Sequence, residues 1–294
     1  ALVGAAVARE PNAPGRNVIL APCVNIHRDP HGGRNFESFG EDPYLTSRIG
    51  VAYVKGVQSE NVVATTKHFV ANNQEYERGS IDVRVSERAL QEIYLPAFKA
   101  AVQEGKTWAI MSSYNRINGH YACANSWLQM DLLKDQWGFR GFVMSDWGAV
   151  HSTIPTVYAE LDLEMPHGLY MNVKDVVAAV KDDRIKESKV DDKVRRMLRT
   201  MMHFGYFEQE VPDGGETRTD QHKEIARKTA EAGIVLLKNE QEILPLQKNK
   251  VKNVALIGPA ASKMNIGGGG SSMVIPLEYT SVVDALKTKC KDIE

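Results

Sequence analysis

The sequence predicts an α/β fold in which strands and helices alternate and close into a (β/α)8-type, TIM-like barrel, followed by the start of a second α/β domain. Short apolar runs suited to buried parallel strands recur at residues 18–22, 62–66, 108–111 and 142–144. Segments with helical periodicity separate these runs. Several runs lead into polar clusters, which favours a barrel because its loops converge on one face. The pattern alone leaves an open doubly wound sheet as the alternative.

Helix signals are clear in the first half of the predicted barrel. Residues 1–10 have a helical pattern from the first residue on. Asp42-Pro43 predicts a helix start, because an acidic N-cap precedes a proline at the first helical position. A helix predicted from Ser86 has apolar residues at helical spacing. Pro96 lies within it and is expected to kink it, because proline has no N–H to donate.

The second half of the predicted barrel ends in a well-marked helix. Another helix is predicted to begin near Ser126, ahead of the strand at residues 142–144. Residues 190–202 have an apolar stripe of helical period, and Gly205 is well placed as the C-terminal cap. The sequence shows no hairpin signal joining two strands of this part.

Three segments are predicted along the chain: a barrel domain over residues 1–207, a linker over 208–220 and the beginning of another α/β domain over 221–294. The last is expected to contain a helix at 225–237, a strand at 254–258 and a helix from near Ser281. A typical barrel has about 250 residues, more than the predicted barrel domain at 1–207 provides. We therefore interpret the chain as a piece of a longer protein, with an N-terminal barrel unit and any signal peptide upstream of residue 1.

The composition is that of a globular enzyme-sized protein. The chain has 294 residues, 43% hydrophobic and 25% charged, with a net charge of −1. Nothing in this charge balance favours nucleic acid or an anionic membrane as a partner. The three cysteines, Cys23, Cys123 and Cys290, are too scattered for a disulfide framework or metal cluster and are interpreted as packing residues. The compartment, cytoplasmic or periplasmic/secreted, and the oligomeric state stay open.

Polar side chains at the predicted strand ends form the candidate site. Asp146 and Trp147 follow Ser145 at the end of the strand at 142–144. Their neighbours in the predicted fold are Arg34, Lys67, His68, Arg78 and Tyr114. One acid among several cations and hydroxyl-bonding groups suits a small polyhydroxylated ligand, because charge-assisted hydrogen bonds discriminate hydroxyl positions. The cations are also expected to hold Asp146 ionised.

Each of these residues also has a purely structural explanation. Asp146 could cap the next helix, and Trp147 could serve only in packing. Arg34 could pair with Glu37 or Glu41, which lie close to it in the sequence. Lys67 could be a solvated strand end and His68 a hydrogen-bonded interior histidine. Only their occurrence together indicates a site.

Two other patterns do not support a ligand site. His27 and His31 are four residues apart, but Pro30, Gly32 and Gly33 exclude the helix on which that spacing would bind a metal. The glycines at 267–270 are not followed by the lysine-serine or lysine-threonine pair of a phosphate-binding loop. They predict a flexible turn or a loop approaching a neighbouring domain.

Ordered motifs along almost the whole chain resemble family 3 of the glycoside hydrolases, particularly its bacterial β-glucosidase branch. These are Gly33-Arg34 with residues 35–43, Lys67-His68-Phe69 with 72–75, 111–115 with Asn118-Gly119, 141–147, 161–166, and the four glycines with Ser271-Ser272. The resemblance implies a barrel domain, then an α/β sandwich domain, with the active site between them. It also implies a retaining enzyme that releases β-linked glucose from non-reducing ends without a metal or organic cofactor.

The resemblance also implies residue roles. Asp146 would be the nucleophile, and Arg34, Lys67, His68, Arg78 and Tyr114 would hold the sugar. Met111 and Trp147 would line the pocket. The partner would be a β-glucoside or short β-linked oligosaccharide.

Compared with the family's pattern, the sequence lacks the general acid/base residue. The family's acid/base glutamate lies within the second domain, beyond residue 294, and an N-terminal aspartate that binds the sugar is also missing. Lys67-His68-Phe69 continues as Val70-Ala71-Asn72, so the His-Asp dyad of the N-acetylglucosaminidase branch is absent. The expectation is a nucleophile without its acid. The alternatives are a β-xylosidase, an exo-β-glucanase or a catalytically incompetent sugar-binding fragment.

Overall fold

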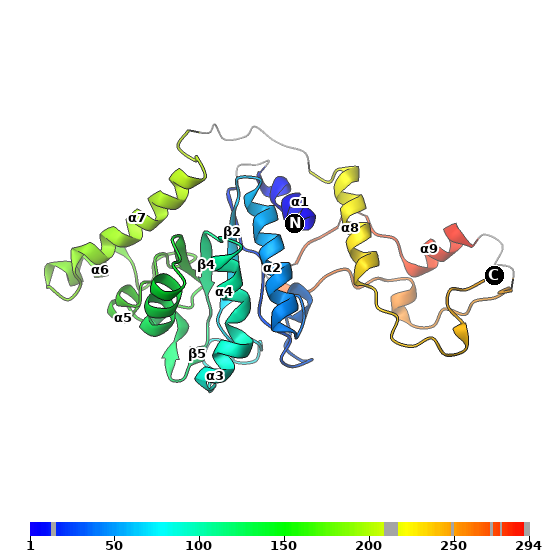
Figure 1. Ribbon diagram of the computed structural model, residues 1–294, viewed down its shortest axis with the longest axis horizontal. Helices are drawn as coiled ribbons and strands as arrows, with labels where there is room; N and C mark the ends of the chain where they lie inside the picture. The colour runs from blue at the N-terminus through cyan, green and yellow to red at the C-terminus, as the bar shows by residue number, and fades with distance from the viewer. Residues whose placement is uncertain (13–15, 209–216, 248–249, 271–272, 277, 291–294) are drawn as a thin grey trace. The chain divides into compact units, whose positions relative to one another are not determined.

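The computed structural model in Figure 1 describes residues 1–294 apart from 13–15, 209–216, 248–249, 271–272, 277 and 291–294. The chain divides into two compact units, residues 1–229 and 230–294. Most of the predicted linker at 208–220 and the Ser271-Ser272 pair lie outside the described residues. The predicted domain boundaries therefore stay predictions.

Four parallel strands form the sheet of the first unit. They are β1 (Val18–Ile19), β2 (Val63–Phe69), β4 (Ala109–Ser112) and β7 (Phe142–Ser145), in the order β1-β2-β4-β7. Because order in space follows order in the chain, every crossover advances in one direction, without the reversal of a doubly wound sheet. This confirms the barrel-type fold and removes the alternative that the pattern left open.

Helix α2 (Pro43–Gln58) packs against α1 (Leu2–Asn12) on one side and α4 (Pro96–Gln103) on the other, and α2 and α4 pack against β2. Helices α2 and α4 lie side by side in Figure 1. Asp42 caps α2 as predicted, accepting hydrogen bonds from the N–H groups of Tyr44 and Leu45. One core cluster fills the helix–strand interface: Ala8, Val54, Val57, Val62, Ala64 and Ala101.

Proline interrupts the predicted helix from Ser86. Its first part is α3 (Glu87–Ala89), capped by the Ser86 hydroxyl, followed by a π-helical turn, η2 (Leu90–Tyr94). Pro96 then begins α4. The break confirms the predicted effect of Pro96, since a proline N cannot donate to the turn before it. The helix predicted near Ser126 is the π-helical segment η4 (Trp127–Gln136).

The expectation of no hairpin was wrong. Strands β5 (Arg116–Ile117) and β6 (His120–Tyr121) pair antiparallel across Asn118-Gly119, and β3 (Asp82–Val83) pairs with β5 on the other side. Asn118 and Gly119 have φ of 50° and 97°, as a two-residue primed turn requires. The Asn-Gly pair was the available signal. Two-residue strands are too short to show an alternating pattern.

The remaining helices of the first unit are α5 (Ile154–Tyr158), α6 (Val173–Lys181) and α7 (Glu187–His203). Helix α7 ends as predicted: Gly205 has φ of 67° and donates to Met202 O, while Tyr206 N donates to Met201 O. These two bonds satisfy carbonyls of the last turn. Helix α8 (Asp220–Gly233) begins earlier than predicted and crosses into the second unit.

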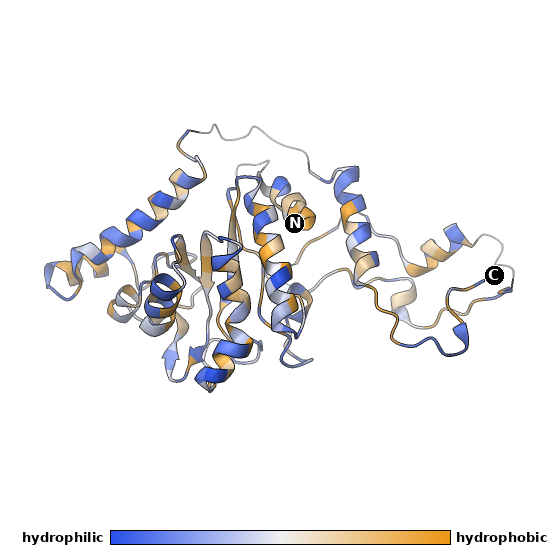
Figure 2. Cartoon of the chain, viewed as in Figure 1, coloured by the Kyte–Doolittle hydropathy of each residue, from blue (hydrophilic) through white to orange (hydrophobic). Residues whose placement is uncertain are grey.

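The second unit has little regular structure among its described residues. It contains η5 (Glu240–Glu242), η6 (Pro259–Ala261) and α9 (Val282–Lys289). Helix α9 starts next to Ser281 as predicted, and the Ser281 side chain accepts a hydrogen bond from the Asp284 N–H. The strand predicted at 254–258 does not form, and Ile257 is 93% exposed. A strand needs a hydrogen-bonded neighbour, and none of the described residues of this unit supplies one. Figure 2 shows hydrophobic residues recurring along its extended segments.

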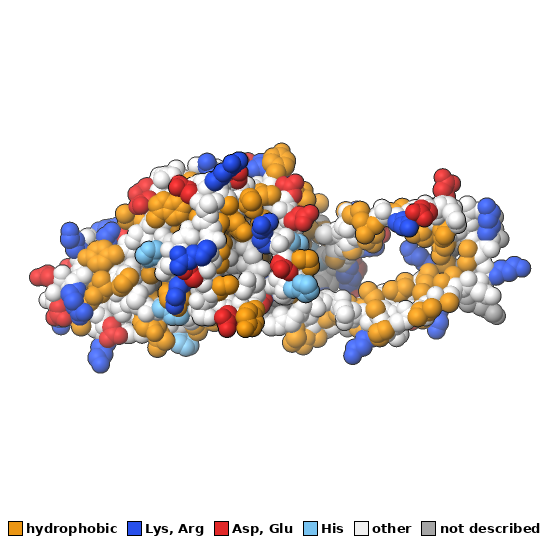
Figure 3. Space-filling view, turned by 90° about the horizontal axis from the view of Figure 1, so that it is seen from below, with side chains coloured by type: hydrophobic (Ala, Val, Ile, Leu, Met, Phe, Trp, Pro, Cys, Tyr) orange, Lys and Arg blue, Asp and Glu red, His pale blue; other side chains and the backbone are white. Residues whose placement is uncertain are grey.

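The surface is mixed in charge. On the face in Figure 3, acidic and basic side chains are interspersed, the pattern that a net charge of −1 predicts. Among the helices that the structure describes, none is both long and apolar enough to cross a membrane.

Candidate functional site

The carboxyl edge of the parallel sheet collects most of the predicted site residues. Asp146 follows the last residue of β7, and Tyr114 lies two residues after β4. Lys67 and His68 lie within the last three residues of β2, which extends beyond the predicted strand 62–66. Because the carboxyl ends of parallel strands meet at one edge, three neighbouring strands bring these side chains together.

Asp146 has two differently placed carboxylate oxygens. The residue is 7% exposed, and its Oδ1 accepts a hydrogen bond from the Trp147 N–H at 2.8 Å. Its Oδ2 is buried and accepts no hydrogen bond of ordinary geometry from the described residues. A buried polar atom of this kind is uncommon and costly. The backbone thus fixes one oxygen and leaves the other without a hydrogen bond of ordinary geometry.

The pKa of Asp146 differs from the expectation. Burial raises the pKa of this carboxyl above its ordinary value of 3.8, because the charged form loses solvation. The Trp147 N–H, the Tyr114 hydroxyl and the charges of Arg34 and Arg78 lower it, but by less. The predicted effect of the cations is therefore present, and burial outweighs it.

His68 has a fixed tautomer. Asn25 donates from Nδ2 to the His68 carbonyl at 2.9 Å, so its Oδ1 faces the His68 ring, where Nδ1 lies 3.0 Å away. Since that oxygen can only accept, Nδ1 carries the proton and Nε2 keeps its lone pair. Burial, then the charges of Lys67, Arg34 and Arg78, hold the pKa of His68 well below 6.5. Nε2 lies 3.7 Å from Asp146 Oδ2, as a neutral acceptor beside the carboxylate.

The cations of the site belong to a chain of alternating charge. Lys67 Nζ lies 3.8 Å from Glu37 Oε2, and Arg34 Nη2 lies 2.5 Å from Glu37 Oε1. Arg34 Nη1 lies 3.9 Å from Glu75 Oε1, and Arg78 Nη1 lies 2.7 Å from Glu75 Oε2. Each carboxylate therefore uses both oxygens and joins two cations.

Tyr114 connects this chain to Asp146. The Arg78 guanidinium lies over the Tyr114 ring, 4.5 Å from its centroid. Burial and the nearby Asp146 carboxylate raise the pKa of Tyr114 to about 12, so the phenol keeps its proton and can donate.

The two predicted pocket-lining residues lie in different surroundings. Trp147 is 40% exposed beside Asp146. Met111 is buried within β4 and packs with Val63, Ala109, Phe142, Met144 and Phe204. The contacts of Met111 are those of a core residue, and its role toward a ligand stays a prediction.

Sequence reasoning missed the residues that support the site. Glu37 was one of two candidate partners for Arg34, and the structure selects it over Glu41. The spacing of three residues between Arg34 and Glu37 was the available signal. Asn25 and Glu75 had no role assigned, because their partners come from other segments of the chain.

One group of residues meets the distance requirement for a metal ion but lacks the chemistry. Ligand atoms of Cys23, Glu37 and His68 lie within 4.8 Å of one another. Burial raises the pKa of the Cys23 thiol to about 12, and His68 Nδ1 donates to Asn25. Glu37 is paired with two cations. Cysteine binds a metal as the thiolate and histidine through an unprotonated nitrogen. The Cys23 thiol keeps its proton, and the His68 nitrogen that lies 3.8 Å from Cys23 Sγ is the protonated Nδ1, so these residues do not fit a metal.

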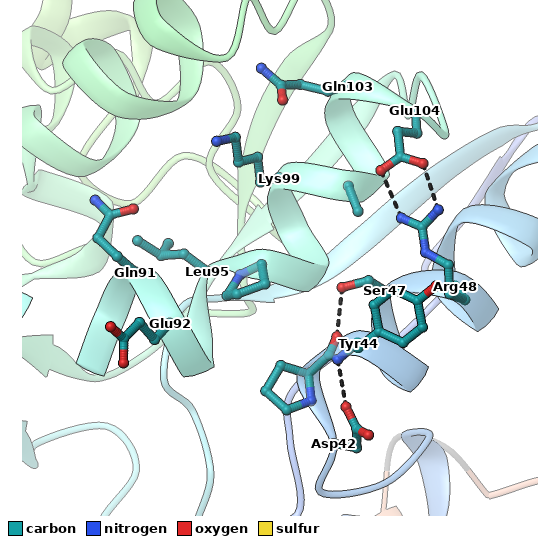
Figure 4. Close-up of a pocket in the computed structure, with 13 residues that line it drawn as sticks. Asp42, Tyr44, Ser47, Arg48, Gln91, Glu92, Leu95, Lys99, Gln103 and Glu104 are labelled. Atoms are coloured by element: carbon teal, nitrogen blue, oxygen red, sulfur yellow. Dashed lines mark hydrogen bonds and ion pairs between the residues drawn. The ribbon is translucent and has the colours of Figure 1, made fainter. Parts of the chain in front are cut away.

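A hollow of about 590 Å³ on the outer helical face contains none of the predicted site residues (Figure 4). It lies between α2 and the helices that precede β4, and Arg48 and Glu104 form a two-bond ion pair at its edge. Glu104 caps the C-terminal end of α4, just before β4 begins, so it lies towards the amino edge of the strands.

Comparisons with known families and proteins cover almost the whole chain. The "Glycosyl hydrolase family 3 N terminal domain" model matches residues 2–200, and the corresponding C-terminal domain model matches 234–292. The chain is 45% identical to a beta-glucosidase of Rhizobium radiobacter, over 97% of this chain and 35% of the relative. It is 43% identical to an exo-alpha-(1->6)-L-arabinopyranosidase of Bifidobacterium breve, over 97% of this chain and 38% of the relative.

Among solved structures, beta-glucosidase 3B from Thermotoga neapolitana in complex with glucose is 38% identical, with a TM-score of 0.90. That match covers 98% of this chain and 41% of the other. The chain thus spans roughly a third to two fifths of the length of these proteins.

Proposed function

Because the chain belongs to glycosyl hydrolase family 3, we propose that it supplies the nucleophile and sugar-binding groups of a retaining β-glucosidase that removes glucose from non-reducing ends. The observation that carries this proposal is the buried Asp146 carboxylate, with Oδ1 held by the backbone and Oδ2 without a hydrogen bond of ordinary geometry from the described residues. Relatives named beta-glucosidase, and one solved with glucose, support the choice of sugar.

In the proposed reaction, Asp146 Oδ2 attacks the anomeric carbon as the bond to the leaving oxygen breaks. A glycosyl ester of Asp146 forms, and water then cleaves it with retention of configuration. A second carboxyl group must protonate the leaving oxygen in the first step and activate water in the second. This reaction belongs to the whole protein, of which the chain supplies the first carboxylate.

The surrounding groups suit the sugar. Arg34, Lys67 and Arg78 offer charge-assisted hydrogen bonds to ring hydroxyls, and neutral His68 offers an acceptor at Nε2. Such contacts discriminate one hydroxyl position from another, because an unmatched buried group would stay unpaired. Trp147, exposed beside the carboxylate, offers a flat apolar surface for the sugar ring.

The decisive test is covalent trapping with 2,4-dinitrophenyl 2-deoxy-2-fluoro-β-glucoside, followed by peptide mapping. Its leaving group departs without an acid, so the 294-residue chain can be used as it is. We expect one added fluoroglucosyl group, on Asp146. A label on a different carboxylate would overturn the assignment of the nucleophile.

A second candidate is an α-L-arabinopyranosidase, which the 43% identical relative of that name favours. The corresponding 2-fluoro-arabinopyranosyl reagent distinguishes the two. Faster labelling of Asp146 by the arabinosyl reagent than by the glucosyl reagent would replace glucose as the proposed sugar and leave the nucleophile unchanged.

A further inference from the structure

Glu37 lies between two of the three cations of the site. Its side chain is 12% exposed, and those of Arg34 and Lys67 are 16% and 13% exposed. We propose that Glu37 is a positioning residue that holds Arg34 and Lys67 in the orientation in which they bind sugar hydroxyls. This assignment rests on the proposed function and adds a residue to it.

The backbone explains how one carboxylate reaches both cations. Glu37 ends the turn η1 (Asn35–Glu37), and its N–H donates to the Arg34 carbonyl at 3.3 Å. The turn places the Arg34 and Glu37 side chains next to each other. Lys67 comes from β2, so the contact at 3.8 Å links the loop to the strand. Glu37 thereby fixes the loop that carries Arg34 relative to the strand that carries Lys67 and His68.

Electrostatics gives Glu37 a second effect. The cations Arg34, Lys67 and Arg78 are balanced by the carboxylates Glu37, Glu75 and Asp146. An unpaired cation in a poorly solvated site is costly, so a cation that loses its carboxylate partner moves towards another carboxylate. Without the Glu37 charge, Arg34 and Lys67 would turn towards the remaining carboxylates, including Asp146. Glu37 thus keeps Arg34 away from the nucleophile and available to the sugar.

Glu75 is a weaker candidate for the same positioning role. Its side chain is 35% exposed, and it lies 3.9 Å from Arg34, against 2.5 Å for Glu37. Solvent screens an exposed pair more than a buried one. We therefore expect Glu75→Gln to have a smaller effect than Glu37→Gln.

The test measures the rate of labelling by the dinitrophenyl fluoroglucoside at several concentrations, which separates the binding constant KI from the rate constant kinact. Glu37→Gln removes the charge at nearly constant size, and Glu37→Asp keeps it on a shorter side chain. Glu104→Gln is the matched control, because it breaks a two-bond ion pair with Arg48 away from the site. Thermal unfolding confirms that each variant folds.

We expect Glu37→Gln to raise KI about 10-fold or more, the scale on which a charge-assisted hydrogen bond contributes to binding. Glu37→Asp should recover part of this loss, and Glu104→Gln should match the wild type. A KI for Glu37→Gln equal to that of the wild type would overturn the proposal, as would equal losses in the Gln and Asp variants.

The pH profile adds a readout that a merely structural role would not change. Asp146 is faced by His68 from β2, Tyr114 from the loop after β4, and Arg34 and Arg78 from the loops after β1 and β2. Removing the Glu37 charge makes these surroundings more positive, which favours the ionised carboxylate. The acid limb of kinact/KI should therefore move to lower pH in Glu37→Gln and stay in place in Glu37→Asp. An unmoved limb in the Gln variant counts against the proposal.

The remaining outcomes also test the role of Glu37. If Glu37→Gln does not fold, Glu37→Asp carries the test, and a wild-type KI in that variant overturns the proposal. An unlabelled wild-type chain that is folded would overturn the proposed function itself, and this assignment with it. A labelled wild type with an unaffected Glu37→Gln overturns only the role of Glu37.

Discussion

Two buried clusters of charged residues contact β7, one beside the Val143 backbone and one at the carboxyl end of the strand, and their carboxylates differ in hydrogen bonding. In one, Asp162 Oδ2 accepts from the Val143 N–H at 2.7 Å and Oδ1 lies 3.1 Å from Lys134 Nζ. Lys134 also donates to the Glu160 carbonyl at 2.6 Å. In the other, Asp146 Oδ2 accepts no hydrogen bond of ordinary geometry from the described residues.

The difference distinguishes a fully paired structural network from the cluster that contains the proposed nucleophile. Both Asp162 oxygens are engaged, so its charge is compensated within the fold and joins β7 to the segment at 160–164. Asp146 is left partly unsatisfied at the sheet edge where ligands bind. Burial raises the pKa of both carboxyls, so the pKa shift alone does not distinguish them. The hydrogen-bond geometry does.

The largest expected effect follows the removal of the proposed nucleophile. Asp146→Asn should slow labelling by the dinitrophenyl fluoroglucoside about 10⁴-fold or more, the scale on which a lost nucleophile acts. Its unfolding free energy should fall little, because Oδ1 can still accept from Trp147. Labelling is followed by mass spectrometry, and stability by urea unfolding. Labelling of another carboxylate at the wild-type rate would show that Asp146 is not the nucleophile.

Breaking the structural network should affect stability first. Asp162→Ala leaves Lys134 with less compensation and the Val143 N–H without its acceptor, so we expect a loss of about 3–5 kcal/mol in unfolding free energy. Urea unfolding at pH 7 measures it. The acid side of the pH profile of the labelling rate, measured on the folded fraction, should not move. A stable variant with a shifted pH profile would show that the two clusters are electrostatically coupled.

Asn25 should act on the reactive cluster through His68. Asn25→Leu removes the acceptor that keeps the proton on Nδ1, so the ring can take the other tautomer and lose its acceptor at Nε2. We expect labelling to slow about 10-fold to 100-fold, corresponding to one buried hydrogen bond of about 1–3 kcal/mol. Asn25→Asp keeps the acceptor and should retain more activity than the Leu variant. NMR of the His68 ring nitrogens reports the tautomer directly.

The smallest effect concerns the pH dependence of the structural cluster. Burial lowers the pKa of Lys193 from 10.5 to about 8, against the opposing charges of Asp162 and Glu160. Between these two values the unfolded chain binds more protons, so the contribution of Lys193 to stability rises with pH from about 8 towards 10.5. The difference in unfolding free energy between wild type and Lys193→Met should grow by about 1 kcal/mol per pH unit there. A constant difference would contradict the lowered pKa.

The predictability of the site depended on distance along the chain. Asp146 and Tyr114 lie within three residues of the ends of apolar runs, so the strand pattern was enough to place them at the sheet edge. Asn25 and Glu75 act on residues more than forty positions away in the sequence (Asn25 on His68, Glu75 on Arg34), and no local pattern contains such a pair. The Asn118-Gly119 hairpin was missed although its signal was local, because its strands have two residues each.

The sequence by itself determined the helix caps at Asp42 and Gly205, the helix start near Ser281, the break at Pro96 and the strands that carry the candidate site, because each depends on neighbouring residues. Only the tertiary structure decided the strand order, the pairing of Glu37 with two cations and the balance at Asp146. Burial has no local signature, since it arises when distant segments exclude water together. It therefore reversed the expected direction of the Asp146 pKa, which the sequence could predict only from the charges nearby.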